Sequence, residues 1–221
     1  IAEEQMDAPG LAPETYARVL HDLAQVNSVT LARRPTLGFL DRLPPADRPL
    51  RLLDVGFGDG DMLRTIARWA LKHGIATELV GIDLNPRSAN VARAQTPADL
   101  RIDYRTGDYA DLAGERWDVV ISSLVAHHMS ASELLSFLRF MDTHAARGWF
   151  INDLHRHGFA WMGYPLLARL AGWHRIVRED GQLSIARSYR PAEWPPLLAA
   201  AGIKGARITR VFPFRLCVEK I

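Results

Sequence analysis

The sequence predicts a doubly wound α/β fold, with a mostly parallel seven-stranded sheet, helices on both faces and an antiparallel hairpin at the carboxyl end. Three observations support this prediction. Short apolar runs alternate with longer segments of helical periodicity. The apolar runs are nearly continuous, as in strands that are covered on both faces. Strand–helix alternation of this kind is typical of parallel strands joined by right-handed crossovers.

The first 48 residues are expected to form a helical cap. Apolar side chains recur at helical spacing from Pro13 to about Leu43, and Pro35 interrupts the pattern, which indicates two helices. The segment Leu43–Pro49 is rich in proline and predicts a turn-containing connector. We therefore expect a cap over residues 1–48 and a larger domain over residues 49–221.

Five strands and three helices are expected to form the first part of the larger domain. The strands are expected at Leu50–Val55, Glu78–Asp83, Leu100–Thr106, Trp117–Val125 and Gly148–Asp153. The helices are expected at Asp61–His73, Asn85–Gln95 and Ser130–Ala145. Gly74 follows the first helix, Pro86 stands at the start of the second, and Ser130 with Glu133 has the spacing of a capping box.

The final third of the chain changes character. Residues 158–175 are aromatic and apolar and predict one helix, part of a lid inserted at about 158–190. A further helix is expected at Pro191–Ala201, ending at Gly202. Two strands, Ala206–Val211 and Arg215–Glu219, then predict a closing hairpin.

Composition favours an ordinary globular protein. Of 221 residues, 48% are hydrophobic and 24% charged, and the formal net charge is only +2. The arginines are scattered, so no nucleic-acid partner is expected. The single Cys217 is expected to be a packed thiol and excludes an internal disulfide. No apolar run could span a membrane and the first residues do not resemble a secretory signal, so we expect a cytoplasmic monomer or homodimer.

A glycine-rich loop is the strongest functional signal. Gly56, Gly58 and Gly60 directly follow the first strand, where absent side chains let backbone N–H groups approach a ligand. Such spacing alone is also common in surface turns. Asp83 makes the pattern more specific, because it ends the second strand 27 residues beyond Gly56, where a carboxylate can accept the hydroxyl groups of a ribose.

The loop differs from those that bind other nucleotide cofactors. Dinucleotide-binding loops have the spacing Gly-x-Gly-x-x-Gly, whereas this chain has Gly-x-Gly-x-Gly. The carboxylates of Asp54, Asp59 and Asp61 would repel a pyrophosphate but would suit a ligand that carries an amino group and a sulfonium. The Gly-x4-Gly-Lys-Ser/Thr loop of nucleoside triphosphatases is absent.

Four segments together resemble class I S-adenosylmethionine-dependent methyltransferases. The segments that carry the resemblance are Leu52–Gly60, Gly81–Asn85, Tyr104–Leu112 and Trp117–Met129. In order and spacing the similarity covers about residues 50–156, and it is greatest to the small-molecule branch that includes ubiquinone and menaquinone methyltransferases. A Rossmann-like methyltransferase fold is therefore expected.

The resemblance implies a site for S-adenosylmethionine, with S-adenosylhomocysteine as product. The backbone at Gly56 and Gly58, with Asp54, would hold the methionine amino group, Asp83 would hold the ribose, and Leu84 would pack on the adenine. The remaining residues expected at the cofactor are Phe57, Asp108 (to the adenine amine), Tyr109, Ser123, Leu124 and Arg34 (to the cofactor carboxylate). Each also has a plain structural alternative, as a cap, a turn or a core residue.

The methyl acceptor is less constrained by the sequence. Enzymes that methylate nucleobase amines commonly carry Asn/Asp-Pro-Pro-Tyr/Phe after the fourth strand, whereas this chain has Ser122–Val125. Histidine titrates near neutrality, so His155 is a candidate base, with capping or loop packing as the alternative. The expected acceptor contacts are His127, His155, Tyr164 and Arg187, with Tyr189 and Arg215 as further polar contacts to an acidic or hydroxylated acceptor. No metal site is expected, because the histidine spacing matches no ligand motif.

The leading hypothesis is a methyltransferase for a small apolar or aromatic metabolite, in secondary-metabolite or quinone-type biosynthesis. The aromatic lid favours such an acceptor, and oxygen is preferred over carbon as the methylated atom. Two alternatives remain: a non-catalytic protein that binds S-adenosylmethionine, and a methyltransferase for RNA or protein.

Overall fold

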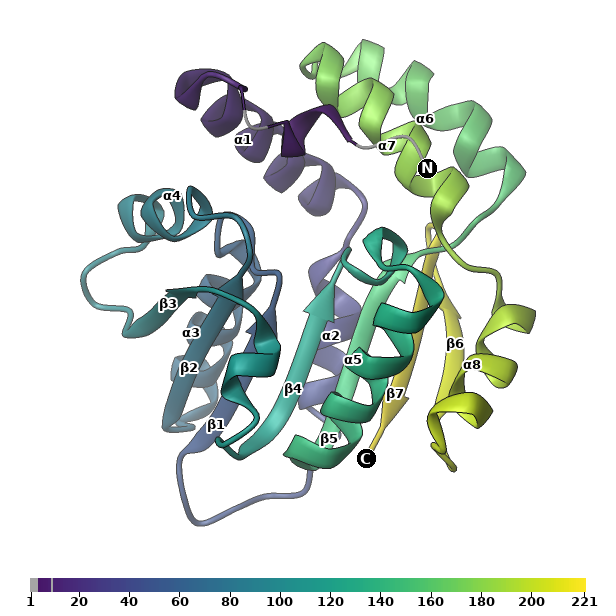
Figure 1. The fold of residues 1–221 in the computed structure, drawn as a ribbon. Helices are drawn as coiled ribbons and strands as arrows, with labels where there is room; N and C mark the ends of the chain where they lie inside the picture. The colour runs from purple at the N-terminus through teal and green to yellow at the C-terminus, as the bar shows by residue number, and fades with distance from the viewer. Residues whose placement is uncertain (1–3, 9) are drawn as a thin grey trace.

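The structure is a computed structural model that describes residues 4–8 and 10–221. Figure 1 shows a single twisted sheet with helices packed on both faces and a further group of helices beyond one end of the strands. The sheet has seven strands in the order β3-β2-β1-β4-β5-β7-β6. The doubly wound fold that the sequence predicts is thus confirmed.

The strands occupy the segments that apolar patterning predicts, with shifts of a few residues at their ends. β1 to β5 pair in parallel, and β7 runs antiparallel to both β5 and β6. Their bounds are β1 Leu50–Val55, β2 Thr77–Asp83, β3 Ile102–Thr106, β4 Trp117–Ser123, β5 Ala145–Leu154, β6 Arg207–Val211 and β7 Arg215–Lys220. The predicted closing hairpin is therefore present, and β7 inserts between β5 and β6.

Two helical layers cover the sheet. α2, α3 and α4 contribute to one hydrophobic core, and α5 and α8 to the other. Their bounds are α2 Arg33–Leu40, α3 Asp61–His73, α4 Ser88–Gln95, α5 Ala131–His144 and α8 Trp194–Ala201. Short 3-10 turns lie at Tyr109–Leu112 (η2), Ala126–His128 (η3) and Pro191–Glu193 (η4).

Local signals at the helix ends explain where these helices begin and stop. Ser130 and Glu133 form the predicted capping box at the start of α5. α3 ends at Gly74, which adopts a φ of +67°. α4 starts at Ser88 rather than at the predicted Asn85, because Asn85 forms a turn in which its side chain accepts a hydrogen bond from the Arg87 N–H at 3.1 Å.

A lid lies beyond the carboxyl ends of the strands (Figure 1). It consists of η1 (Gln5–Asp7), α1 (Pro13–Val29), α6 (Gly158–Leu170) and α7 (Arg175–Arg187). Its small core is built from Val19 and Val26 of α1, Ala168 of α6, Ile176 and Val177 of α7, and Trp173 between the last two helices. The lid thus joins the start of the chain to a segment about 150 residues later.

One prediction about the lid needs correction. The sequence predicts one helix over 158–175, but the chain turns at Gly172, where φ is +70°, and begins a new helix after His174. The His174 side chain caps that helix by accepting from the Ile176 N–H at 3.2 Å. Within the expected cap over residues 1–48, α1 packs on α7 whereas Phe39 of α2 stacks on Phe150 of the sheet. The division of the chain into a cap and a larger domain stays a prediction.

Within the described part of the chain, the structure has no helix that is both long enough and apolar enough to cross a membrane. α1, with 17 residues, alternates polar and apolar side chains along its length.

Candidate active site

A cavity of about 1020 Å³ lies between the lid and the carboxyl ends of the strands. Its wall includes the loop after β1, the turn after β2, the ends of β4 and β5, and parts of α1, α6 and α7. Ligand pockets in proteins commonly measure about 300–1,000 Å³. The cavity is therefore large enough for two small molecules held next to each other.

The loop after β1 has a shape that requires glycine. Gly56, Gly58 and Gly60 have φ values of +77°, +57° and +78°. A Cβ atom on Gly56 would lie 2.3 Å from Val125 Cγ2, and one on Gly60 would lie 2.5 Å from the Tyr104 hydroxyl oxygen. The loop leads directly into α3, so backbone N–H groups and the positive end of a helix are placed at the cavity wall.

Asp83 fixes the loop to the neighbouring strand. Its carboxylate accepts hydrogen bonds from the Gly58 N–H at 2.9 Å and from the Asn85 N–H at 2.8 Å. Burial raises the pKa of Asp83, although both hydrogen bonds act in the opposite direction. A carboxylate oxygen can accept more than one hydrogen bond, so Asp83 can still accept from a ligand in the cavity.

Asp54 is a buried carboxyl group that lacks a full set of partners. It is 1% exposed, and its Oδ1 has no hydrogen-bond partner among the described residues. Burial, reinforced by the charge of Asp83, raises the pKa of Asp54 to about 8. A ligand with a positive charge or an N–H donor at this point of the cavity wall would stabilise the ionised form.

A histidine–aspartate pair lies at the ends of β4 and β5. His127 Nδ1 is 2.7 Å from Asp153 Oδ1, and the His127 backbone N–H donates to Asp153 Oδ2 at 3.0 Å. Burial would raise the pKa of Asp153, but the His127 charge and the hydrogen bonds lower it. Burial would lower the pKa of His127, but Asp153 and Glu4 raise it. Asp153 thus orients the ring and stabilises its protonated form.

Two more histidines line the cavity near this pair. Burial and the charge of His127 lower the pKa of His128 to about 4. Burial, with the positive charges of His157, Arg210 and Arg190, also lowers the pKa of His155. Both rings are therefore neutral at physiological pH and can accept a hydrogen bond or a proton.

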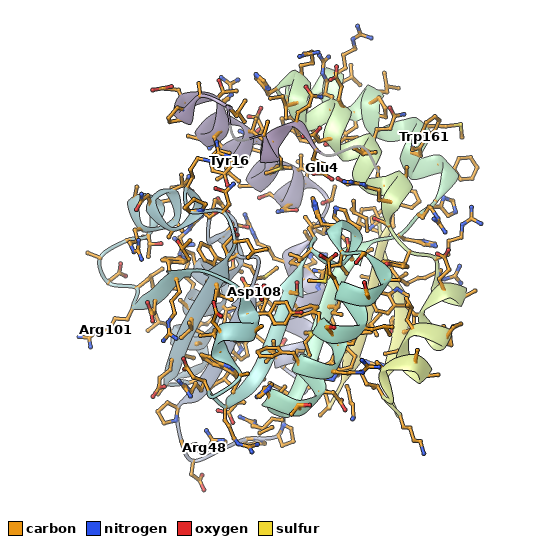
Figure 2. The ribbon with its side chains drawn as sticks, in the orientation of Figure 1. Glu4, Tyr16, Arg48, Arg101, Asp108 and Trp161 are labelled. Atoms are coloured by element: carbon orange, nitrogen blue, oxygen red, sulfur yellow. The ribbon has the colours of Figure 1, made fainter. Side chains whose placement is uncertain are left out.

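Glu4 also lies at this site, although no local sequence pattern predicts it there. It lies between α7 and the sheet (Figure 2), and its Oε1 accepts from the Ser184 hydroxyl at 2.6 Å. The same oxygen is 3.8 Å from His127 Nε2, 3.7 Å from His128 Nε2 and 3.6 Å from Arg187 Nη1. The N–H groups of Gln5 and Met6 donate to the two Asp180 oxygens, each at 3.0 Å, and hold this segment on α7.

Glu4, His127 and His128 form the kind of cluster that can bind a metal ion. Their ligand atoms lie within 4.8 Å of one another. Arg187 already places a positive charge beside the Glu4 carboxylate, however, which weakens the attraction for a cation. The expectation that the protein needs no metal stays a prediction.

The structure gathers most of the predicted site residues around the one cavity. The residues that line it are Asp54, Gly56, Phe57, Gly58, Asp83, Leu84, Tyr109, Ser123, Leu124, His127, His155 and Tyr164. Leu84 is 74% exposed, as a side chain that packs on a planar ligand would be. Tyr164 donates its hydroxyl hydrogen to the Val177 carbonyl at 2.9 Å, so its ring, more than its hydroxyl, faces the cavity.

Four predicted residues lie outside the wall of the cavity, and one of them, Tyr189, packs on the ring of Trp194. Asp108 caps η2 by accepting from the Ala110 N–H at 2.9 Å, and Arg187 reaches the site only through Glu4. Arg34 is exposed on α2, whereas Arg33 lines the cavity and makes two 2.7 Å hydrogen bonds with Asp61. Successive residues of a helix point in directions about 100° apart, so a choice between neighbours needs the phase of the helix.

Comparisons with known proteins agree with this architecture. Residues 52–148 match the model of a methyltransferase domain. The ubiquinone biosynthesis O-methyltransferase of Azorhizobium caulinodans is 38% identical over 86 residues, which are 37% of this chain and 31% of the relative. The enzyme of the same name from Ruegeria pomeroyi is 37% identical over 144 residues, 62% of this chain and 54% of the relative. The matched part of the chain thus spans 31% to 54% of the length of these relatives.

Solved structures show the same fold at low sequence identity. A S-adenosylmethionine-dependent methyltransferase from Aquifex aeolicus has a TM-score of 0.63 at 16% identity, covering 95% of this chain and 97% of its own. Human N-acetylserotonin methyltransferase has a TM-score of 0.65 at 16% identity, covering 94% of this chain and 56% of its own. These structures share the fold of this chain, and residues 52–148 match a methyltransferase domain.

Proposed function

We propose that this protein binds S-adenosylmethionine and transfers its methyl group to a hydroxyl oxygen of a small apolar or aromatic molecule, with carbon as a less favoured acceptor atom. The observation that carries the proposal is that one cavity joins the glycine loop and Asp83 to the His127–Asp153 pair. The relatives named ubiquinone biosynthesis O-methyltransferases support the same class of reaction.

The residues around the glycine loop fit the cofactor. Asp54 offers an unpaired carboxylate oxygen to the ammonium group, and the glycine loop allows close approach of the methionine part. Asp83 offers acceptors for the ribose hydroxyls, and Leu84 offers an exposed apolar face to the adenine. When bound, the cofactor supplies an activated methyl group on a sulfonium.

The protein's contribution to the transfer is alignment, exclusion of water and removal of a proton. The lid forms part of the cavity wall, so an acceptor held there would be partly shielded from solvent. Because Asp153 is bonded to Nδ1 of His127, the lone pair of the neutral ring is on Nε2. His127 can therefore accept the proton that leaves the acceptor hydroxyl, and Asp153 stabilises the resulting imidazolium.

His155 remains a second candidate for the base. It also lines the cavity and is held neutral by its surroundings, but it has no carboxylate partner among the described residues. We favour His127 because Asp153 both orients its ring and stabilises its charged form.

The experiment that tests the proposal is incubation with methyl-labelled S-adenosylmethionine and a panel of phenols and enols, followed by mass spectrometry. The expected product carries one labelled methyl group on oxygen. Binding of S-adenosylhomocysteine without transfer to any small molecule would contradict the proposal and favour a non-catalytic binding protein. Transfer only to RNA or protein would contradict the proposed acceptor class.

A further inference from the structure

Arg215 is a buried arginine in the wall of the cavity, and it lacks an ion-pair partner among the described residues. It is 2% exposed, and its Nη1 has no hydrogen-bond partner there. Its Nη2 donates to Asn27 Oδ1 and to Thr30 Oγ1, both at 3.2 Å. Burial lowers the pKa of Arg215 to about 10, with Asp153 and Cys217 acting in the opposite direction, so the side chain is charged at neutral pH.

Anchoring α1 to the sheet does not account for a charged side chain at this position. The two hydrogen bonds from Nη2 to Asn27 and Thr30 need only a neutral donor, which a glutamine could supply. Burying an arginine without a bonded counter-ion is unfavourable, and arginine is the side chain best suited to bind a carboxylate with two parallel hydrogen bonds. Nη1 of Arg215 is thus a hydrogen-bond donor that has no partner among the described residues.

The neighbours of Arg215 provide further donor capacity. Asn27 and Thr30 also line the cavity. Because Asn27 accepts from Arg215 through its oxygen, its amide N–H groups are directed elsewhere and can serve a second ligand. Thr30 is held in place by donating to the Val26 carbonyl at 2.8 Å. Arg215 and Asn27 can therefore offer two adjacent donors to one anionic group.

The position of Arg215 in the sheet places its unpaired Nη1 on the acceptor side of the cavity, away from the cofactor side. Arg215 pairs with Leu154, the residue after Asp153, so it belongs to the side of the cavity that holds the His127–Asp153 pair. The glycine loop follows β1, which is separated from β7 by β4 and β5. Three strand spacings correspond to about 14 Å across the sheet.

We propose that Arg215, with Asn27, binds a carboxylate of the methyl acceptor, so that the acceptor is an apolar hydroxylated acid. This inference rests on the proposed function, because it names the acceptor class for the same cavity. A carboxylate bound at β7 would fix one end of the acceptor and direct its hydroxyl toward His127. The remaining wall, with Phe159, Leu167 and Phe214, would enclose the apolar part of the molecule.

The test compares acids with their methyl esters on protein saturated with S-adenosylhomocysteine. The probes are 3,4-dihydroxybenzoate, 3,4-dihydroxycinnamate and the methyl ester of each, titrated by calorimetry. We expect each acid to bind at least about tenfold more tightly than its ester, the scale for one charged hydrogen-bond pair. In Arg215→Gln the acid should lose that advantage, while the ester keeps its affinity.

Matched variants separate this role from a structural one. Arg215→Lys keeps the charge and should retain part of the preference for the acid, which makes the test informative even if the glutamine variant fails to fold. Arg33→Gln removes another arginine of the cavity wall, one whose charge Asp61 already balances, and should leave the acid-to-ester ratio unchanged.

Several results would overturn the inference. The unmodified protein would contradict it by binding acid and ester equally, or by binding neither acid. Arg215→Gln would contradict it by losing affinity for acid and ester equally. A change in Arg215→Gln that is confined to S-adenosylhomocysteine affinity would assign Arg215 to the cofactor carboxylate instead. If the unmodified protein does not bind S-adenosylhomocysteine, the proposed function itself fails. If it binds S-adenosylhomocysteine but shows no preference for acids, only the acceptor assignment fails.

Discussion

At the scale of single residues, Asp54 links stability to the proposed binding of the cofactor. The pKa of about 8 means that the folded protein disfavours the ionised carboxylate, and the penalty grows as pH rises from about 4, the ordinary value, toward 8. A group that weakens the fold but faces a cavity is typical of a binding site. Replacing Asp54 should therefore change the free energy of unfolding and the affinity for the cofactor in opposite directions.

We predict that Asp54→Asn stabilises the protein and weakens cofactor binding. Asparagine has a similar shape and no charge, so the free energy of unfolding should rise by about 2–5 kcal/mol at pH 8 and by a smaller amount at pH 5. Urea denaturation at both pH values measures the difference, and calorimetry with S-adenosylhomocysteine measures binding. A variant that is less stable at pH 8 and binds as tightly as the unmodified protein would contradict this account of Asp54.

The His127–Asp153 pair predicts a particular dependence of methylation on pH. Asp153 and Glu4 raise the pKa of His127, and only the neutral ring can accept a proton, so the rate should increase with pH through that raised pKa. Asp153→Asn should shift this rise to lower pH and reduce the maximal rate by about 10²–10⁴-fold. His155→Ala is the comparison, and a larger loss in that variant would assign the base to His155.

The residues of the candidate site differ in how well the sequence could predict their positions. Gly58 and Asp83 were predictable because Gly58 lies in the loop after β1 and Asp83 is the last residue of β2, and parallel strands end at the same edge of the sheet. The contact between His127 and Asp153 depends on β4 and β5 being neighbours in the sheet. The sequence of either segment alone does not show which strands are neighbours. Glu4 could not be predicted, because its place depends on packing against α7, which lies about 180 residues later.

At the scale of elements, the loop between β1 and α3 is the most constrained part of the site. Its backbone has positive φ at three glycines, and side chains of β3 and of the loop after β4 occupy the space next to two of them. The shape of the loop is therefore determined by contacts as well as by its own sequence.

We predict that Gly56→Ala abolishes cofactor binding whereas Gly74→Ala does not. Both glycines have φ near +70°, so each substitution should cost about 1–2 kcal/mol of stability. Only at Gly56 would the new Cβ meet another side chain, that of Val125, while nothing lies within 4 Å of a Cβ on Gly74. Thermal denaturation and titration with S-adenosylhomocysteine test this pair, and equal binding by the two variants would contradict it.

Other elements show why local patterns succeed or fail. The capping box of α5 is a signal within four residues, and the sequence predicted it correctly. α7 was not predicted as a separate helix because its sequence is mostly polar, has only a weak apolar stripe and contains Gly181. That glycine is explained only by the tertiary structure, in which the ring of Tyr164 would lie 2.3 Å from a Cβ at this position.

At the scale of the whole molecule, the described residues form a sheet with two helical layers and a smaller lid. Figure 1 shows the lid beyond the strand ends, and Figure 2 shows Trp161 on the outer side of α6. The lid has its own small hydrophobic cluster, whereas two larger clusters hold the sheet. Regions with small cores open more readily than regions with large ones.

We predict that ligand binding stabilises the lid more than the sheet. Amide hydrogens of α1, α6 and α7 should exchange faster than those of β1 and β4 in the free protein, and saturating S-adenosylhomocysteine should slow exchange in the lid. Hydrogen–deuterium exchange with mass spectrometry measures both. Unchanged exchange in the lid with slower exchange in the glycine loop would show that the lid does not close over the cofactor.

The central claim is that the cavity binds S-adenosylmethionine through the glycine loop and Asp83. Calorimetric titration with S-adenosylhomocysteine tests it most directly, on the unmodified protein, on Asp83→Ala and on Asp103→Ala, an exposed aspartate of the neighbouring strand β3. We predict submillimolar binding, a loss of about 1–3 kcal/mol in Asp83→Ala, the scale for a hydrogen-bonded charged partner, and no change in Asp103→Ala. No binding by the folded protein, or equal affinity in all three, would contradict the account.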